Sequence, residues 1–465
     1  MKIKKPNIIL ITTDQHRYDS LGVNGNSILR TPNIDSLARD GVNFRQAYVQ
    51  NTVCVPSRAC IQTGRYTHQH GVTYMESIID NTPGLPHWEK TFMEYLQDAG
   101  YCTGAAGKIH MYPEKGFHRM KLTGGKGSRW VYSSGQEIGP APLGPEYAAW
   151  LEKKRPGAYE EIYEARRKQP DYKSAHIFEN TVSAEEYVEN WIGEEALGFI
   201  TGNTGQQPFF LWCGFCGPHD PWDPPVPYNT MYNPADVSLP EEIPGWPSWK
   251  NLWDEKTVRK IRAYYYGMIT CIDDQIGRLV SILKSRDLYN DTILILSSDH
   301  GEFLCERGRT GKALFYDSIL HVPLIIKPPK GDLINTPVFD GLVENFSIAP
   351  TILDYAGLDI PGTMCASSLR PYIEGTGINK EAIFSEYIGN DRLEMSKCIR
   401  TRDFKYILHI HSGREELYNL QEDPREKVNL LTDNPEHPEK ILLQKKLLTW
   451  MCTTEWRNSR DQSAR

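Results

Sequence analysis

Short apolar segments alternate with helical segments along most of this 465-residue chain, and this alternation constrains its fold more than any other feature. Short apolar runs that end in polar residues are typical of strands buried on both faces. Segments with apolar residues every three or four positions are typical of helices that cover a sheet. The predicted strands are residues 7–13, 209–215, 292–298 and 322–327, and the predicted helices are 31–38, 90–99, 185–200 and 258–284. This order predicts an α/β fold with a large doubly wound sheet flanked by helices.

Two long segments interrupt the alternation, and a third change of character comes near the C-terminus. Residues 113–172 contain many Gly, Pro and basic residues, and residues 219–253 are rich in Pro and Trp. Long irregular segments often form lids or pocket walls, so we expect both to lie beside a site. The pattern changes near residues 365–371, and short strands and a helix over 438–450 follow. We therefore predict a main domain over residues 1–365 and a smaller α+β subdomain over 366–465, with a small antiparallel sheet and a terminal helix.

Composition excludes several classes of function. Charged residues make up 24% of the chain and hydrophobic residues 40%, which is ordinary for a soluble enzyme. The net charge is −7 and long Lys or Arg runs are absent, so we expect no nucleic-acid partner. The first apolar run, Ile8 to Ile11, is too short for a signal peptide or a membrane span. This predicts a cytoplasmic protein without membrane association, unless a leader has been trimmed.

The cysteines give little sign of a disulfide framework. There are ten of them, and their spacing is scattered. Cys213 and Cys216 form a CxxC pair, but they lie within an apolar run that is typical of a buried strand, so we interpret them as core residues. Cys54 differs because it begins the pentapeptide Cys54-Val55-Pro56-Ser57-Arg58, which leads into Thr63-Gly64-Arg65. Taken alone, the pentapeptide favours a loop that enters a helix, with Cys54 as a small buried residue.

Polar pairs directly follow two of the predicted strands. Asp14 and Gln15 come after the first strand, and Asp299 and His300 come after the strand at 292–298. Chemistry gathers at the carboxyl ends of strands in doubly wound sheets. Each Asp could simply cap a turn. Two matching placements instead favour a divalent cation with oxygen ligands.

Together these motifs resemble one known family along nearly the whole chain. The matching segments, in order, are 7–15, 31–44, 54–65, 107–110, 217–221, 298–302, 311–317, 321–324 and 416–430. The chain is identified as similar to the type I sulfatases of the alkaline-phosphatase superfamily. The resemblance implies an alkaline-phosphatase-like mixed sheet, with the catalytic domain over residues 1–365. It also implies that a maturation enzyme oxidises Cys54 to formylglycine, whose hydrated form can release sulfate by breaking its own C–O bond.

The resemblance also implies a role for each matching residue. Asp14, Gln15, Asp299 and His300 would hold one divalent metal together with an oxygen of the modified Cys54. Arg58 and Lys108 would hold the formylglycine hydroxylate, and His110 would take the proton of its second hydroxyl. His219 and Lys312 would bind the sulfate and protonate the leaving alcohol. Such a set offsets the negative charge of a sulfate ester, and a histidine suits proton transfer near ambient pH.

Two departures from the family pattern leave the metal and the substrate open. Many sulfatases have a second aspartate where this chain has Gln15, and an asparagine where it has His300. The family implies Ca²⁺, while the imidazole ligand also admits Mn²⁺, and Mg²⁺ is a further alternative. The same pairs resemble phosphonate monoester and phosphodiester hydrolases of the superfamily. Those relatives lack the Lys108 and His110 pair, so we rank sulfate ester hydrolysis first. A non-catalytic sulfate- or sugar-binding relative would have lost reactive residues that this chain keeps.

The identity of the substrate stays open at this point. An aryl, steroid or carbohydrate sulfate, either a small molecule or a glycan, would fit the family. Aromatic residues of the two long segments could stack on its ring or merely pack the loops. These are Trp130, Tyr132, Trp222, Trp246, Trp249 and Trp253. We interpret His68 and His70, downstream of Cys54, as structural, and we leave the oligomeric state open.

Overall fold

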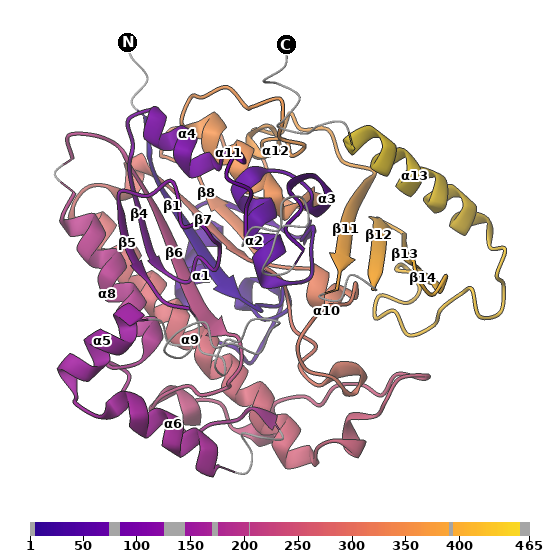
Figure 1. The fold of residues 1–465 in the computed structure, drawn as a ribbon, viewed down its shortest axis with the longest axis horizontal. Coiled ribbons are helices and arrows are strands. Elements are labelled where there is room, and N and C mark those ends of the chain that lie inside the picture. The colour runs from indigo at the N-terminus through magenta and orange to yellow at the C-terminus, as the bar shows by residue number, and fades with distance from the viewer. Residues whose placement is uncertain are drawn as a thin grey trace.

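The computed structural model describes residues 5–73, 84–124, 145–169, 175–203, 205–389 and 394–455. Its centre is an eight-stranded sheet in the order β5-β4-β6-β1-β7-β8-β2-β9 (Figure 1). The strands in that order are Arg119–Leu122, Cys102–Gly107, Phe209–Pro218, Asn7–Asp14, Thr292–Ser298, Leu324–Lys327, Val42–Phe44 and Val338–Phe339. The five strands from β5 to β7 run parallel, whereas β8 is antiparallel to both β7 and β2. The sheet is therefore mixed, as predicted.

The central strand β1 shows why both faces of the sheet are covered. Ile8 and Leu10 point into one hydrophobic core, and Ile9 and Ile11 point into another, because side chains alternate along a strand. Helices α2, α4 and α11 pack in the first core: Cys54–Thr63, Phe92–Asp98 and Ile348–Tyr355. Helices α1, α8 and α9 pack in the second: Pro32–Arg39, Val188–Thr201 and Glu255–Ser285. The predicted fold class, a doubly wound mixed sheet flanked by helices, is confirmed.

The two segments predicted to be irregular differ from each other. Within 113–172, the described residues contain β5 and two helices, α5 (Pro145–Lys154) and α6 (Ala158–Lys168), so this prediction is wrong for that part. Helix α5 begins at a proline and ends in two lysines, and both features are typical of helix ends. The prediction gave more weight to the many Gly and Pro residues of the whole segment. Within 219–253, the helices are single 3₁₀ turns, at Tyr228–Thr230, Pro234–Asp236 and Trp249–Asn251.

The C-terminal part is a separate four-stranded antiparallel sheet with a helix across it (Figure 1). The strands β11 to β14 are Ala382–Ile388, Met395–Thr401, Phe404–His409 and Glu415–Asn419, and the helix α13 is Pro438–Thr454. Trp450 of α13 shares a hydrophobic core with Tyr66 and Phe346 of the main part. This sheet and helix match the predicted α+β character, while the domain boundary at residue 365 stays a prediction.

Short elements complete the main part. They are β3 (Ala47–Tyr48), β10 (Val343–Glu344), α3 (Thr67–His70), α10 (Asp317–Leu320) and α12 (Arg370–Ile373). Within the described ranges, none of the helices has both the length and the apolar character needed to cross a bilayer.

Candidate active site

Four adjacent parallel strands end at the same edge of the sheet, and a polar residue stands at each end. Asp14 is the last residue of β1, and Gln15 follows it. Lys108 directly follows β4, His219 follows β6, and Asp299 follows β7. Residues far apart in the sequence thus meet at one place, because parallel strands bring their carboxyl ends together.

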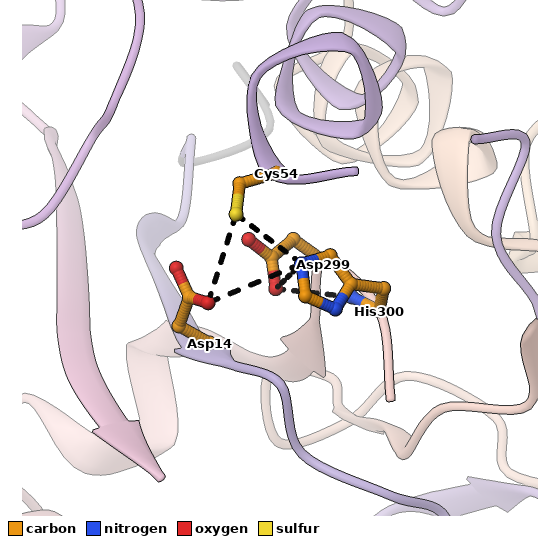
Figure 2. Close-up of side chains that lie close together, drawn as sticks. All are labelled: Asp14, Cys54, Asp299 and His300. Carbon is orange, nitrogen blue, oxygen red and sulfur yellow. Dashed lines mark hydrogen bonds and ion pairs between the residues drawn. The ribbon is translucent and has the colours of Figure 1, made fainter. Parts of the chain in front are cut away.

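Helix α2 brings Cys54 to this edge. Cys54 is the first residue of the helix, and its side chain is buried. Its Sγ, one oxygen each of Asp14 and Asp299, and a ring nitrogen of His300 all lie within 4.8 Å of one another (Figure 2). His300 Nε2 is 3.3 Å from Sγ. The structure therefore brings together four of the five residues predicted to hold a metal, and Gln15 lies beside them.

Arg58 lies one turn along the same helix and binds both carboxylates. Its Nε donates to Asp299 at 2.8 Å, and its Nη2 donates to Asp14 at 3.1 Å, with all three side chains fully buried. Its third donor, Nη1, binds the carbonyl oxygen of Lys108 at 2.8 Å. Burial disfavours the charged guanidinium, but Asp299 and Asp14 outweigh burial and raise the pKa of Arg58. Arg58 is thus a fixed cation at the centre of the site.

Two glycines position Lys108 in the same cluster. Gly107 has φ of +90°, and a Cβ there would lie 2.1 Å from the carbonyl oxygen of Gly214 on β6. Only glycine fits this close approach. The amide of Lys108 then donates to that same carbonyl at 2.7 Å, and its Nζ reaches Asp14 at 2.6 Å. Burial alone would raise the pKa of Asp14, but Lys108 and the other nearby cations hold it well below its ordinary value.

Lys312 closes the cluster from the opposite side. Its Nζ lies 2.6 Å from Cys54 Sγ, 3.2 Å from Gln15 Oε1 and 3.0 Å from His300 Nε2. Burial lowers the pKa of Lys312, but the negative groups around it, Cys54 and Asp14 foremost, raise it overall. We call Asp14, Arg58, Lys108, Asp299 and Lys312 the strand-end cluster. It contains three cations and two carboxylates.

Three histidines lie around the strand-end cluster. Burial lowers the pKa of His300 to about 4, so its ring is neutral near pH 7, as a metal ligand requires. Burial, followed by Lys108 and Arg58, holds the pKa of His110 well below its ordinary value. His219 follows the Pro218 that pairs with Asp14, and it contributes to the lowered pKa of Asp14. All ten predicted site residues therefore gather at this sheet edge.

Glu302 is a part of the site that sequence reasoning missed. It is fully buried and accepts a hydrogen bond from Gln15 Nε2. Its other oxygen accepts from the backbone amides of Leu304, at 3.1 Å, and Gly311. Since the amide nitrogen of Gln15 faces Glu302, its Oε1 is left to face Lys312. The signal was present in the segment Ser298-Asp299-His300-Gly301-Glu302, where a second acidic residue follows the strand end.

This donor set fits a divalent cation. Carboxylate oxygens of Asp14 and Asp299, the amide oxygen of Gln15 and a neutral imidazole of His300 converge in a buried volume. Hard divalent cations take such oxygen ligands, and Mn²⁺ accepts the imidazole as well. Ion pairs with Arg58 and Lys108 fix the carboxylates of Asp14 and Asp299, so these two ligands are in position before any ion binds.

Two of the six aromatic residues proposed to stack on a substrate are instead buried in the protein. Trp222 and Trp249 are 1% and 4% exposed. Trp246 lies edge-on to Tyr316, with ring centroids 5.4 Å apart. Trp130 and Tyr132 lie outside the described residues. The stacking interpretation is therefore wrong for Trp222 and Trp249, because both indole rings are buried in the protein.

The fold and the site define a hydrolase of the alkaline-phosphatase-like class. The sequence matches the family model described as "Sulfatase" over residues 6–358, and the model described as "N-sulphoglucosamine sulphohydrolase, C-terminal" over residues 305–452. The chain belongs to the sulfatase family, and several of its relatives are named as arylsulfatases or sulfatases, which are sulfuric ester hydrolases.

A sequence relative agrees with this family, and two solved structures agree with the fold. The chain is 32% identical to an arylsulfatase of Clostridium perfringens, and the match covers 96% of this chain and 94% of that protein. The fold is similar to that of a phosphonate monoester hydrolase of Agrobacterium radiobacter, with a TM-score of 0.81, 23% identity, and coverage of 97% and 96%. It is also similar to a protein solved with its substrate D-glucosamine-2-N,6-O-disulfate, with a TM-score of 0.73, 24% identity, and coverage of 98% and 99%. At these identities the two structures bear on the fold alone.

Proposed function

We propose that this enzyme hydrolyses an aryl, steroid or carbohydrate sulfate ester to an alcohol and inorganic sulfate, through a formylglycine made from Cys54. The observation that carries the proposal is the placement of residue 54. Its Sγ lies 2.6 Å from Lys312 Nζ, beside Asp14 and His300, where the oxygens of a hydrated aldehyde would stand. The three cations of the strand-end cluster lie close to residue 54 and can offset the charge of an anionic ester.

The predicted site residues have the following parts in this reaction. The hydrated side chain at position 54 attacks sulfur, while Arg58 and Lys108 offset its developing negative charge. Lys312 binds the sulfate group, and His219 protonates the leaving alcohol. His110 is held neutral by burial and by the neighbouring cations. A neutral imidazole can accept the proton of the second hydroxyl when sulfate is released.

The proposed metal is a divalent cation held by Asp14, Gln15, Asp299, His300 and an oxygen of residue 54. When bound, it would supply positive charge that lowers the pKa of a coordinated hydroxyl. Ca²⁺ is our first choice from the family, with Mn²⁺ and Mg²⁺ as alternatives. A maturation enzyme that oxidises Cys54 is a required partner.

A second candidate function is hydrolysis of a phosphonate monoester or a phosphodiester at the same site. The pairs Asp14-Gln15 and Asp299-His300 favour it, and the fold likeness to a phosphonate monoester hydrolase agrees with it. Against it stand Lys108, which binds Asp14, and His110, whose pKa responds to Lys108 and Arg58. These two residues supply the base and the cation that release of sulfate requires, so we rank sulfate ester hydrolysis first.

The primary test measures modification and activity on the same sample. The protein is expressed with and without a formylglycine-generating enzyme, and mass spectrometry determines the state of Cys54. Both samples are then assayed on aryl, steroid and glycan sulfates and on a phosphonate monoester. We expect the aldehyde form to hydrolyse a sulfate fastest. An active sample that carries only unmodified cysteine would refute the mechanism, and a preference for the phosphonate would favour the second candidate.

The variant His110→Ala tests the release step. Loss of a general base commonly slows a reaction by about a hundred- to ten-thousandfold. We expect the first sulfuryl transfer to proceed and a sulfated adduct at position 54 to accumulate, which acid quench and mass spectrometry detect. His411, exposed in a C-terminal turn, offers a matched control, since His411→Ala should turn over as the parent does. Normal turnover by His110→Ala would exclude it as the base.

A further inference from the structure

Asp220 lies between His219 and His176, next to the strand-end cluster. His219 Nδ1 is 3.2 Å from one oxygen of its carboxylate, and His176 Nδ1 is 2.7 Å from the other. The side chains of His219, Asp220 and His176 are 21%, 24% and 52% exposed. The group therefore connects the site to solvent, unlike the fully buried centre around Arg58.

The backbone holds His176 in this position from a distant part of the sequence. Its carbonyl oxygen accepts from the amide of Trp222 at 2.8 Å, and the amide of Phe178 donates to the carbonyl oxygen of Trp222 at 3.1 Å. His176 itself has φ of +54°, a conformation that a histidine rarely adopts without surrounding support. Two segments are thus tied together so that an imidazole faces the Asp220 carboxylate.

His219 has two acceptors at the same ring nitrogen. The carbonyl oxygen of Asp220 lies 2.6 Å from Nδ1, and this contact fixes the proton on Nδ1 and the direction of the ring. A carboxylate oxygen of Asp220, at 3.2 Å, lies on the same side of the ring, so Nε2 is the ring nitrogen that points away from Asp220. Burial raises the pKa of Asp220, but His219, His176 and Lys312 outweigh burial and lower it.

We propose that Asp220 is a positioning residue that holds His219 as the proton donor to the leaving alcohol, and that His176 fixes the Asp220 carboxylate from the opposite side. This rests on the role proposed above for His219. Asp220 touches neither the sulfate nor the reacting atoms, so its effect reaches the reaction only through His219. Asp220 matters most for alcohols that are poor leaving groups, because these need a proton as the S–O bond breaks.

The test uses esters that differ only in leaving group: 4-nitrophenyl, phenyl and alkyl sulfates. In Asp220→Asn the backbone contact to His219 stays, and only the charge is removed. We expect kcat/KM to fall about ten- to a hundredfold for the phenyl and alkyl esters, because part of the general acid effect is lost. For the 4-nitrophenyl ester we expect a change of at most about threefold, since that group departs without a proton. An equal loss on all three esters would overturn the proposal.

Two further variants distinguish an effect of Asp220 that passes through His219 from an effect of its own. In His219→Ala, the added Asp220→Asn should cause no further loss on any ester, because both changes act through one group. Losses that multiply would mean that Asp220 acts independently of His219. His176→Gln keeps a donor to Asp220 and removes only a positive charge, so it should keep the parental dependence on leaving group. If His176→Gln instead reproduces the Asp220→Asn pattern, a neutral donor at position 176 does not hold the Asp220 carboxylate, and the role proposed for His176 is wrong.

Controls keep this result distinct from failure of the proposed function. An unchanged melting temperature shows that Asp220→Asn is folded. Phosphonate monoesters with the same leaving groups are run in parallel, so the comparison can be made whichever ester the enzyme prefers. If His219→Ala leaves the dependence on leaving group unchanged, His219 is not the acid, and the positioning role of Asp220 falls with it. Sulfate release from residue 54 would still be judged separately by the adduct experiment.

Discussion

Two buried groups of charged residues in this protein differ in their charge balance. The strand-end cluster has three cations and two carboxylates, all converging on residue 54. The interface cluster, which we define as His68, Glu386 and Lys397, ties α3 to the C-terminal sheet. There a single carboxylate accepts from His68 Nδ1 at 2.9 Å and from Lys397, which also lies over the ring of Trp450.

The difference shows that buried charges can support catalysis in one place and stability in another. In the interface cluster the carboxylate has matched partners, so nothing remains for a ligand to neutralise. The strand-end cluster has three cations and two carboxylates, so its cations can bind an anionic substrate and its carboxylates can bind a divalent cation. Substitutions should therefore affect activity in the first group and stability in the second.

The largest effect is expected from Asp299→Asn in the strand-end cluster. The amide keeps the shape of the side chain but removes a negative charge from the metal site. Divalent metals supply several kcal/mol of transition-state stabilisation, so turnover should fall about a thousandfold or more. Bound metal, measured by elemental analysis after dialysis, should fall with it. Full metal content together with lost turnover would show that Asp299 is not required for metal binding.

Lys397→Met in the interface cluster should have the opposite signature. It leaves Glu386, which is fully buried, without its main cation. Breaking a buried pair in this way commonly costs about 3–5 kcal/mol of stability. Urea denaturation should reveal this loss, while kcat at a temperature where the variant is folded stays unchanged. A parental urea midpoint, or a loss of kcat in the folded variant, would contradict the division between the two clusters.

Glu302→Gln should weaken metal binding without touching a metal ligand. The carboxylate accepts from Gln15 and from two backbone amides, and a glutamine has only one acceptor oxygen for these three donors. Loss of such a supporting contact commonly costs about ten- to a hundredfold in metal affinity. Competition with a fluorescent chelator measures it directly. Unchanged affinity would show that Gln15 is oriented without Glu302.

The smallest effect concerns acid stability in the interface cluster. Burial raises the pKa of Glu386, but Lys397 and His68 outweigh burial and lower it far below its ordinary value of 4.5. A depressed folded-state pKa contributes stability above pH 4.5, and that contribution is lost as the pH falls through the folded value. Glu386→Gln should therefore be less stable than the parent at pH 7, and the gap should narrow below about pH 4.5. Melting curves over this range check the sign. A gap that widens in acid would be inconsistent with the assignment.

Local sequence patterns predicted the fold class and four strands of the sheet, and most of the site residues followed only from the resemblance to the sulfatase family. The strand at 292–298 has the bounds that were predicted, because an apolar run closed by polar residues has few alternatives. Asp14, Asp299 and Cys54 were predicted from short motifs, and the structure brings them together. Helices α5 and α6 were missed although both bury apolar residues in the second core, because the Gly and Pro residues of the whole segment were taken as a sign of irregular structure.

What the sequence by itself determined is the set of reactive residues and the strand or helix on which each stands. Only the tertiary structure decided which carboxylate faces which cation, that Glu302 orients Gln15, and that His176 meets Asp220. These contacts join segments whose separation in the chain leaves no local pattern. They depend on strand order and on how the buried side chains pack. Hydrogen-bond geometry then selects one arrangement of these side chains among the many that the same residues could form.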